Sequence, residues 1–311
     1  MLPTNPPLGT RSLRYGTPGA IEAAAAVIAR GGCVAVPTET VYGLAADATD
    51  SRAVAGIYAA KGRPSFNPLI VHVPDLDAAR AVARFDDAAL ALAARWWPGP
   101  LTLVLPLADG SAVAALATAG LDTVAVRVPA HRAMQALLKA CGRPLAAPSA
   151  NASGGISPTR ASHVLASLDG RIELILDDGA TPAGIESTIV DPARGLILRP
   201  GPITAEQLGF ARGPEGGAIT APGQLSSHYA PGKPVRLDAT ERRSGEWLIG
   251  FGAVEGDDTL SASGDLVEAA SRLFDALHRA DASNAAAIAV APVPYTGLGE
   301  AINDRLQRAA F

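Results

Sequence analysis

One segment organises the interpretation of this chain: Lys61-Gly62-Arg63-Pro64-Ser65-Phe66-Asn67-Pro68-Leu69-Ile70-Val71-His72. It contains two cations on alternate residues, two prolines and an amide, and then an apolar run that ends in histidine. Only three of the 26 basic residues are lysines, and the compact ammonium of a lysine suits a phosphate. A solvated loop before a buried strand is the simpler alternative. We favour a loop that holds a ligand, because loops on a rigid scaffold commonly carry chemistry.

The overall composition limits the classes of function. The chain has 311 residues, of which 48% are hydrophobic, so two domains with buried cores are expected. The net charge of −4 gives no general attraction to nucleic acid, and an RNA contact would need a local basic patch. Cys33 and Cys141 have neither disulfide nor metal-site spacing. Because neither a signal peptide nor a membrane-spanning apolar run is recognisable, we expect a cytoplasmic protein without a membrane partner.

Alternating helix and strand signals predict an α/β fold with two parts. Helices are expected at the segments 21–28, 50–60, 74–84, 86–95, 130–140, 265–280 and 300–310. Strands are expected at the segments 33–36, 69–71, 101–105, 123–128, 145–147, 184–191, 196–202, 247–251 and 286–290. The composition predicts a loose tail over 1–16, a first domain over 17–210, a Gly- and Pro-rich linker over 211–234 and a small α/β domain over 235–311.

Two polar loops follow predicted strands, where open α/β sheets bind ligands. Pro37-Thr38-Glu39-Thr40-Val41-Tyr42-Gly43-Leu44 follows the first strand, although its threonines would equally suit a turn that satisfies its own backbone. The segment Ser149 to Thr159 contains glycines, hydroxyls and amides and precedes a predicted helix. Such loops cradle phosphate through backbone N–H groups, so this loop is a second candidate site.

Arg127 lies in the predicted strand 123–128, on the same face as Thr123 and Ala125. A cation inside an apolar strand is costly unless it meets an anion. A substrate carboxylate and an internal Asp or Glu both satisfy this requirement, and the sequence does not choose between them.

The candidate residues point to phosphate chemistry. The sequence has no Ser-His-Asp order, no His-Glu-x-x-His motif and no Cys/His metal cluster, so hydrolase and zinc sites have little support. Cations and amides around a polyphosphate stabilise the charge that develops during phosphoryl or nucleotidyl transfer. Mg²⁺ is expected with such a site and can be held mainly by the ATP phosphates, so no protein metal ligand is predicted.

Taken together, five ordered motifs resemble those of the YrdC-type threonylcarbamoyl-AMP synthases. They are Pro37–Leu44, Lys61–His72, Ser149-Ala150-Asn151, Glu186-Ser187-Thr188 and Arg199-Pro200-Gly201. The segment His228-Tyr229-Ala230-Pro231-Gly232 and the rest of the chain resemble the longer, two-domain members. The resemblance implies an N-terminal α/β domain with a twisted sheet over a concave active site. It also implies a Rossmann-like C-terminal domain whose linker closes over that site.

The resemblance also implies a reaction. L-threonine, bicarbonate and ATP would give threonylcarbamoyl-AMP and pyrophosphate, and a tRNA threonylcarbamoyl transferase would use the product to form threonylcarbamoyladenosine in tRNA. Direct contact with tRNA is compatible with this role but not required. An RNA-binding module that uses the concave face is the alternative function, which the net charge of −4 disfavours.

Residue roles follow from the resemblance, motif by motif. Lys61 and Arg63 would assist catalysis by stabilising the departing pyrophosphate. The residues implied for L-threonine are Thr40, His72, Arg127, Ser187 and, through its backbone, Ala147. The residues implied for ATP are Lys61, Arg63, Asn67, Thr123, Ser149, Asn151, Ser157, Arg199 and Tyr229.

Overall fold

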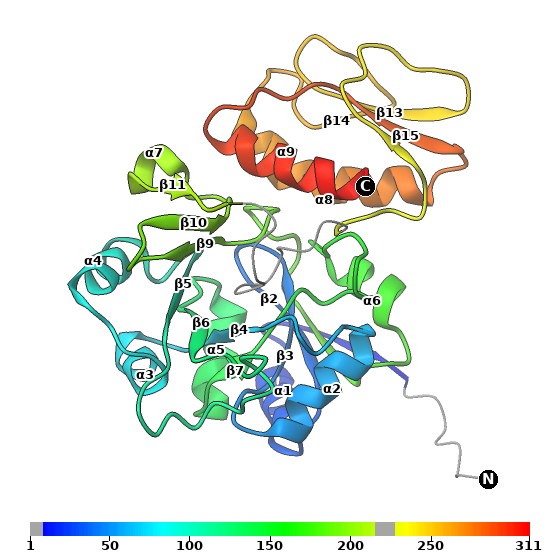
Figure 1. Ribbon diagram of the computed structural model, residues 1–311. Helices are drawn as coiled ribbons and strands as arrows, with labels where there is room; N and C mark the ends of the chain where they lie inside the picture. The colour runs from blue at the N-terminus through cyan, green and yellow to red at the C-terminus, as the bar shows by residue number, and fades with distance from the viewer. Residues whose placement is uncertain (1–8, 215–227) are drawn as a thin grey trace.

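The computed structural model describes residues 9–214 and 228–311, which form two α/β parts, each with its own sheet (Figure 1). The first part contains the strands β1 (Arg11–Arg14), β2 (Val34–Pro37), β3 (Tyr42–Asp47), β4 (Ile70–His72), β5 (Leu101–Pro106), β6 (Thr123–Arg127), β7 (Leu145–Ala146), β8 (Leu174–Asp177), β9 (Thr188–Asp191), β10 (Leu196–Arg199) and β11 (Ala211–Arg212). Its helices are α1 (Ala20–Ala29), α2 (Ser51–Lys61), α3 (Leu76–Val82), α4 (Asp87–Trp96), α5 (Arg132–Cys141), α6 (Ala161–Leu168) and α7 (Ala205–Leu208).

The large sheet has eleven strands in the order β1-β8-β2-β3-β7-β4-β6-β5-β9-β10-β11. Its centre is mixed, because β4 is parallel to β6 and antiparallel to β7. The register of β4 and β6 sets His72 directly beside Arg127. Two residues that are 55 positions apart in the sequence are therefore neighbours on one sheet.

Helices cover both faces of the large sheet, as the alternation of side chains requires. On β2, Val34 and Val36 join the apolar cluster formed with α1 and α5. Ala35, between them, joins the opposite cluster, which includes residues of α2, α3, α4 and α6. With both faces buried, the sheet is a rigid base for the loops at its strand ends.

The structure corrects two expected boundaries. The tail expected over 1–16 is wrong for Arg11–Arg14, which form β1 at the sheet edge, parallel to β8. This strand is mostly exposed and is held by backbone pairing, so it has no apolar pattern to reveal it. Likewise, Ala211–Arg212 belong to the large sheet as β11 and not to the linker. Of the linker expected over 211–234, the segment 215–227 lies outside the described residues, as do residues 1–8 of the expected tail.

The second part is a small parallel α/β domain, as expected. Its strands are β12 (Val235–Arg236), β13 (Glu246–Gly250), β14 (Asp258–Thr259) and β15 (Ala287–Val290), in the order β12-β15-β13-β14. Its helices are α8 (Leu266–Ala282) and α9 (Leu298–Ala309), which lie between this sheet and the first part (Figure 1). Within the described ranges, no helix is both long and apolar enough to cross a bilayer.

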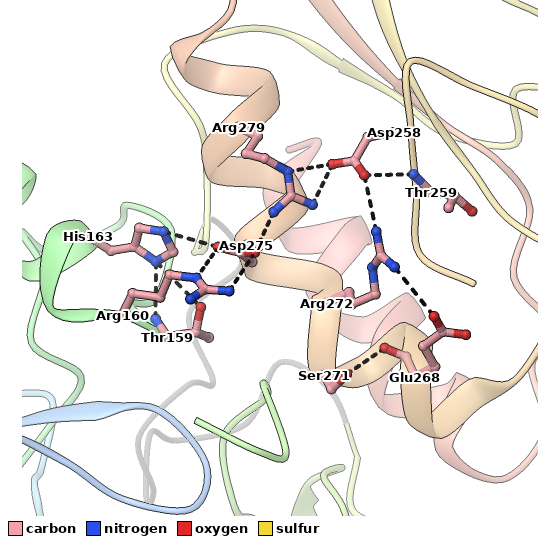
Figure 2. A network of polar contacts seen from close by, with 10 residues as sticks. All are labelled: Thr159, Arg160, His163, Asp258, Thr259, Glu268, Ser271, Arg272, Asp275 and Arg279. Atoms are coloured by element: carbon pink, nitrogen blue, oxygen red, sulfur yellow. Dashed lines mark hydrogen bonds and ion pairs between the residues drawn. The ribbon is translucent and has the colours of Figure 1, made fainter. Parts of the chain in front are cut away.

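The two parts meet through a network of charged residues that joins α6 to α8 (Figure 2). Asp275 accepts hydrogen bonds from Arg160 and lies 3.3 Å from His163 Nε2. The ring of His163 is stacked on that of His278, with 3.8 Å between the centroids. Close backbone packing accompanies this network, because a Cβ on Gly184 would lie 2.5 Å from the Ala270 carbonyl oxygen of α8. The interface is therefore both tightly packed and charged.

We expect this interface to weaken in acid. Burial, together with the neighbouring His163, lowers the pKa of His278 from 6.5 to about 4. Between pH 6.5 and pH 4, His278 binds more protons in the unfolded chain than in the folded one, so the free energy of unfolding falls as the pH falls. The stabilisation that comes from neutral His278 is therefore complete above pH 6.5 and is lost towards pH 4. The expected slope is at most about 1.4 kcal/mol per pH unit for this group.

Urea unfolding of the wild type and of His278→Gln, at intervals between pH 7.5 and pH 4.5, measures this contribution. The wild type should lose more free energy of unfolding than the variant as the pH falls. Arg272→Gln, on the same helix, leaves His278 in place and should keep the wild-type slope. Equal slopes for all three proteins would contradict the assignment.

Candidate active site

A pocket lies where the loops of the large sheet meet the C-terminal domain. It encloses about 540 Å³, including the solvent at its mouth. Eight of the residues expected at the active site line it: Thr40, Arg63, His72, Arg127, Ala147, Ser149, Ser187 and Arg199. They come from the β2–β3 turn, the loop after α2, β4, β6, the loop after β7 and the segments around β9 and β10. Residues separated by up to 159 positions therefore share one cavity.

The β2–β3 turn forms one wall. Thr38 Oγ1 accepts hydrogen bonds from the amides of Thr40 and Val41, both at 3.2 Å, and donates to the Val41 carbonyl at 2.7 Å. The turn thus satisfies its own backbone through a threonine hydroxyl, as one of the two sequence interpretations held. It also fixes Thr40, whose hydroxyl accepts a hydrogen bond from Arg127 Nη1 at 3.1 Å. Both interpretations of the turn are therefore compatible with the geometry.

Arg127 is buried and has an internal carboxylate partner. Its Nη2 donates to Glu39 Oε1 at 2.5 Å, and its Nε donates to the Gly99 carbonyl at 3.1 Å. The internal-anion alternative is thus confirmed. A guanidinium has five N–H groups, and bonds within the described residues use three of them, counting that to Thr40. Two N–H groups are left without a bond to the described residues.

His72 provides a neutral group beside this cation. Burial, and then the charge of Arg127, lowers the pKa of His72 to about 3, so the ring is uncharged near neutral pH. Its Nδ1 atom is buried and has no hydrogen-bond partner among the described residues. A buried polar atom without a partner is costly, and a ligand donor or acceptor would satisfy it.

Lys61 lies behind the Ser149–Asn151 segment. Its Nζ donates to the carbonyls of Ser149 and Asn151, each at 2.5 Å, and its own carbonyl accepts from the Ser153 amide at 2.8 Å. Burial, and then the charge of Arg63, holds the pKa of Lys61 well below its ordinary value. The lysine therefore shapes the glycine-containing loop that the sequence singled out as a candidate phosphate site.

The other two cations of the pocket are likewise held by carbonyl groups. Arg63 donates to the carbonyls of Asn67 and Pro68, at 3.4 and 3.2 Å. Arg199 donates to the Ser187 carbonyl at 3.1 and 3.0 Å and to the Ser187 hydroxyl at 3.1 Å. Carbonyl partners fix the direction of a cation but do not cancel its charge, so a positive field remains.

This crowding of buried cations favours an anionic ligand. Burial lowers the pKa of Arg63 to about 10, and burial also lowers the pKa of Arg199, with Arg305 and Arg127 adding to the effect. The fold therefore holds these charges at a cost in free energy. A bound polyphosphate would offset that cost, and such a local field is compatible with a chain whose net charge is −4.

Six expected residues do not line the pocket, and five of these are connected to it. Lys61 Nζ donates a hydrogen bond to the Asn151 carbonyl, and Arg63 Nε donates one to the Asn67 carbonyl. Ser157 donates to Glu186, and Tyr229 follows the pocket residue His228. Thr123 is the exception, because it lies at the far end of β6, about 13 Å along the strand from Arg127. Its role at the ATP site remains a prediction.

Some residues of the pocket were not predicted. Thr38, Glu186 and His228 line it together with four residues of the wall: Val41, Gly43, Ile70 and Pro148. Most of them belong to the motifs quoted above, so the signal was present in the sequence. In the part of the chain that the structure describes, no group of three or more His, Cys, Asp and Glu side chains could hold a metal ion.

Comparisons with known proteins identify the family. The Sua5/YciO/YrdC family model, described as "Telomere recombination", matches residues 26–201. A second model, "Threonylcarbamoyl-AMP synthase, C-terminal domain", matches residues 203–311. The chain belongs to the Sua5-type threonylcarbamoyl-AMP synthase family. Its fold, nucleotidyltransferase activity and role in tRNA threonylcarbamoyladenosine modification, all expected from the motifs, are thereby confirmed.

Relatives match over nearly the whole chain. The threonylcarbamoyl-AMP synthase of Pyrococcus abyssi is 40% identical over 320 residues, covering 93% of this chain and 94% of its own. That of Bacillus subtilis is 40% identical over 321 residues, covering 93% and 92%. The crystal structure of P. abyssi Sua5 complexed with L-threonine has a TM-score of 0.87 and 38% identity, covering 96% of each chain.

We expect Lys61 to stabilise the folded chain through the loop that it supports. Lys61→Met should lower the free energy of unfolding by about 1–3 kcal/mol, because it leaves two buried carbonyls with fewer donors. Urea unfolding measures this change, and hydrogen exchange of the Ser149–Asn151 amides should accelerate. Lys139→Met, which changes an exposed lysine, is the matched control and should be close to neutral. A loss no larger than that of the control would refute this role.

Proposed function

We propose that this pocket joins L-threonine, bicarbonate and ATP to form threonylcarbamoyl-AMP and pyrophosphate. The observation that carries the proposal is that two kinds of polar group line one cavity, and we assign them to two sides. Arg127, His72 and Thr40 form a small polar side with two free guanidinium N–H groups. Arg63, Arg199 and the Ser149 loop, supported by Lys61, form a positively charged side.

On the first side, Arg127 binds the threonine carboxylate through its two remaining N–H groups. His72 Nδ1 and the Thr40 hydroxyl lie on the same wall and suit the polar groups of an amino acid. Ser187 lies between the two sides, and its hydroxyl contacts Thr102 Oγ1 at 2.7 Å and Arg199 at 3.1 Å. The Ala147 backbone completes this side, close to Ile70. The threonine amine would thus be directed towards the charged side, where bicarbonate and the α-phosphate meet.

On the second side, the cations hold the triphosphate. The threonine amine adds to bicarbonate with loss of water, giving N-carboxythreonine. A carboxylate oxygen of this intermediate then attacks the α-phosphorus, and the bond from that phosphorus to the leaving pyrophosphate oxygen breaks. Lys61, Arg63 and Arg199 stabilise the charge on the departing pyrophosphate. No side chain is required as a covalent nucleophile.

Asn67, Asn151, Ser157, Tyr229 and Thr123 complete the proposed ATP site. The buried Oδ1 of Asn67 and hydroxyl of Tyr229 have no hydrogen-bond partner in the described ranges. Neither residue lines the pocket, and we assign them to the ATP site as neighbours of Arg63 and His228. Mg²⁺ that arrives on the ATP phosphates would supply further charge stabilisation. We assign the chemistry to the part expected over 17–210, now extended by β1 and β11, with a contribution from residues 228 and 229.

The product determines the partner. Threonylcarbamoyl-AMP is a reactive mixed anhydride, so a tRNA threonylcarbamoyl transferase must consume it promptly. We propose that the reaction takes place in the cytoplasm and that it does not require direct contact of this chain with tRNA.

Release of pyrophosphate from ATP tests the reaction. The wild type should release pyrophosphate only when threonine and bicarbonate are both present. Omission of either should reduce the rate to background, and serine should replace threonine poorly if the pocket selects the side chain. Release that continues without threonine would overturn the proposal.

Arg127→Lys tests the threonine side. A lysine keeps the charge and its bond to Glu39 but loses the fork that binds a carboxylate, so the KM for threonine should rise about tenfold or more. The KM for ATP should change less than about threefold, since the cations of the other side are untouched. An equal rise in both constants would show that the two sides are wrongly divided.

A further inference from the structure

Arg305 is the one arginine of the C-terminal domain that is completely buried. It lies on α9, where apolar residues such as Ile302 and Leu306 pack into the core of their own domain. A guanidinium is not needed to fill space there, and its burial is costly unless it is fully paired. Its contacts therefore indicate a specific purpose.

Those contacts reach the two segments that carry the pocket residues Ser187 and Arg199. Arg305 Nε donates to Glu186 Oε2 at 3.1 Å, and Nη1 donates to the Pro200 carbonyl at 2.6 Å. Each contact residue is the immediate sequence neighbour of a pocket residue. One side chain from the C-terminal domain therefore fixes the positions of both segments relative to each other.

The same guanidinium also contacts the segment that follows the linker. It lies 5.5 Å from the centroid of the Tyr229 ring, over its face. The backbone of this segment is held from both domains, because the His228 amide donates to the Arg308 carbonyl at 3.2 Å and the Ala230 amide to the Gly154 carbonyl at 2.8 Å. Arg305 thus lies where three segments of the site converge.

Charge explains why the site needs this residue. Glu186 lines a pocket that must accept a polyanion, and its own charge opposes binding. Arg305 is the only cation in contact with Glu186 among the described residues, and Ser157 donates to the other carboxylate oxygen. Asp304, the second carboxylate on Arg305, has further partners in Arg212 and Arg308. Loss of Arg305 would therefore leave Glu186, but not Asp304, without a cation.

We propose that Arg305 is a positioning residue of the active site, contributed by the C-terminal domain. It holds the Glu186 carboxylate on Ser157, and so keeps Arg199 and Arg63 available to the phosphates of ATP. Without it, Glu186 would turn towards Arg199 and compete with the nucleotide. The inference rests on the proposed function, because it assigns ATP to this side of the pocket.

Steady-state pyrophosphate release, with ATP and threonine varied separately, tests the proposal on the full chain. Arg305→Met should raise the KM for ATP about tenfold or more, while the KM for threonine changes less than about twofold. Adding Glu186→Gln in that background removes the unpaired charge and should recover a substantial part of the loss. Arg279→Ala, at the outer part of the same domain interface, is the matched control and should leave both constants unchanged.

A purely structural role predicts a different pattern. The melting temperature of Arg305→Met would then fall, both constants and kcat would change together, and Glu186→Gln would give no recovery. That result would overturn the proposal. If Arg305→Met does not fold, Arg305→Lys replaces it, since a lysine keeps the charge but cannot reach Glu186 and Pro200 as a fork. An unchanged KM for ATP in Arg305→Lys would also overturn the proposal.

The controls separate this inference from the proposed function. Absence of threonine-dependent turnover in the wild type would contradict the reaction itself. ATP binding, measured by titration calorimetry without threonine, still reports on Arg305 in that case. If the wild type is active and Arg305→Met binds ATP with wild-type affinity, the inference is contradicted while the proposed function stands.

Discussion

The whole site depends on buried cations that are held by carbonyl oxygens and not by carboxylates. Lys61, Arg63 and Arg199 each donate to backbone carbonyls of loops that line or support the pocket. A carboxylate partner would have cancelled each charge and left nothing for a ligand. Carbonyl dipoles hold the cations in place but stabilise them less than carboxylates would. The fold therefore retains a positive cavity inside an acidic protein. Arg127 differs from these cations, because the Glu39 carboxylate is paired with it.

Much of the fold could be predicted, because local signals agreed with the final structure. The helices expected at 50–60, 86–95 and 265–280 are present as α2, α4 and α8, and their N-caps are Asp50, Asp86 and Asp265. Two of the missed strands share a cause. β1 is a polar edge strand, and β3 is rich in glycine and alanine, so neither has strong strand propensity. β1 is a strand because β8 pairs with it, and β3 is a strand because β2 and β7 pair with it. β8 and β7 are distant in the sequence from the strands that they pair with, and the pairing of β2 with β3 is recognisable only in the sheet.

The candidate site was predictable where its residues lie in compact motifs. Thr40, Arg63, His72, Ser149, Ser187 and Arg199 all lie in such motifs, and the structure gathers them around one pocket. The pairings between motifs could not be predicted. Arg127 and Glu39 are 88 positions apart, and Arg305 and Glu186 are 119 apart, so nothing local records either contact. Thr123 shows that a shared strand face does not predict proximity, because Thr123 and Arg127 lie at opposite ends of β6.

The contact between Arg305 and Glu186 also affects the order of events during synthesis. Domains generally fold from the N-terminus as the chain emerges from the ribosome. The large sheet can therefore form while α9 has yet to be made, and in that interval Glu186 faces the cations of the pocket without its own partner. If Arg305 positions Glu186 as proposed, the nascent site would bind nucleotide less well until the C-terminal domain docks. Assembly of the two domains would then act as the final step of maturation, after which the pocket is free to bind nucleotide.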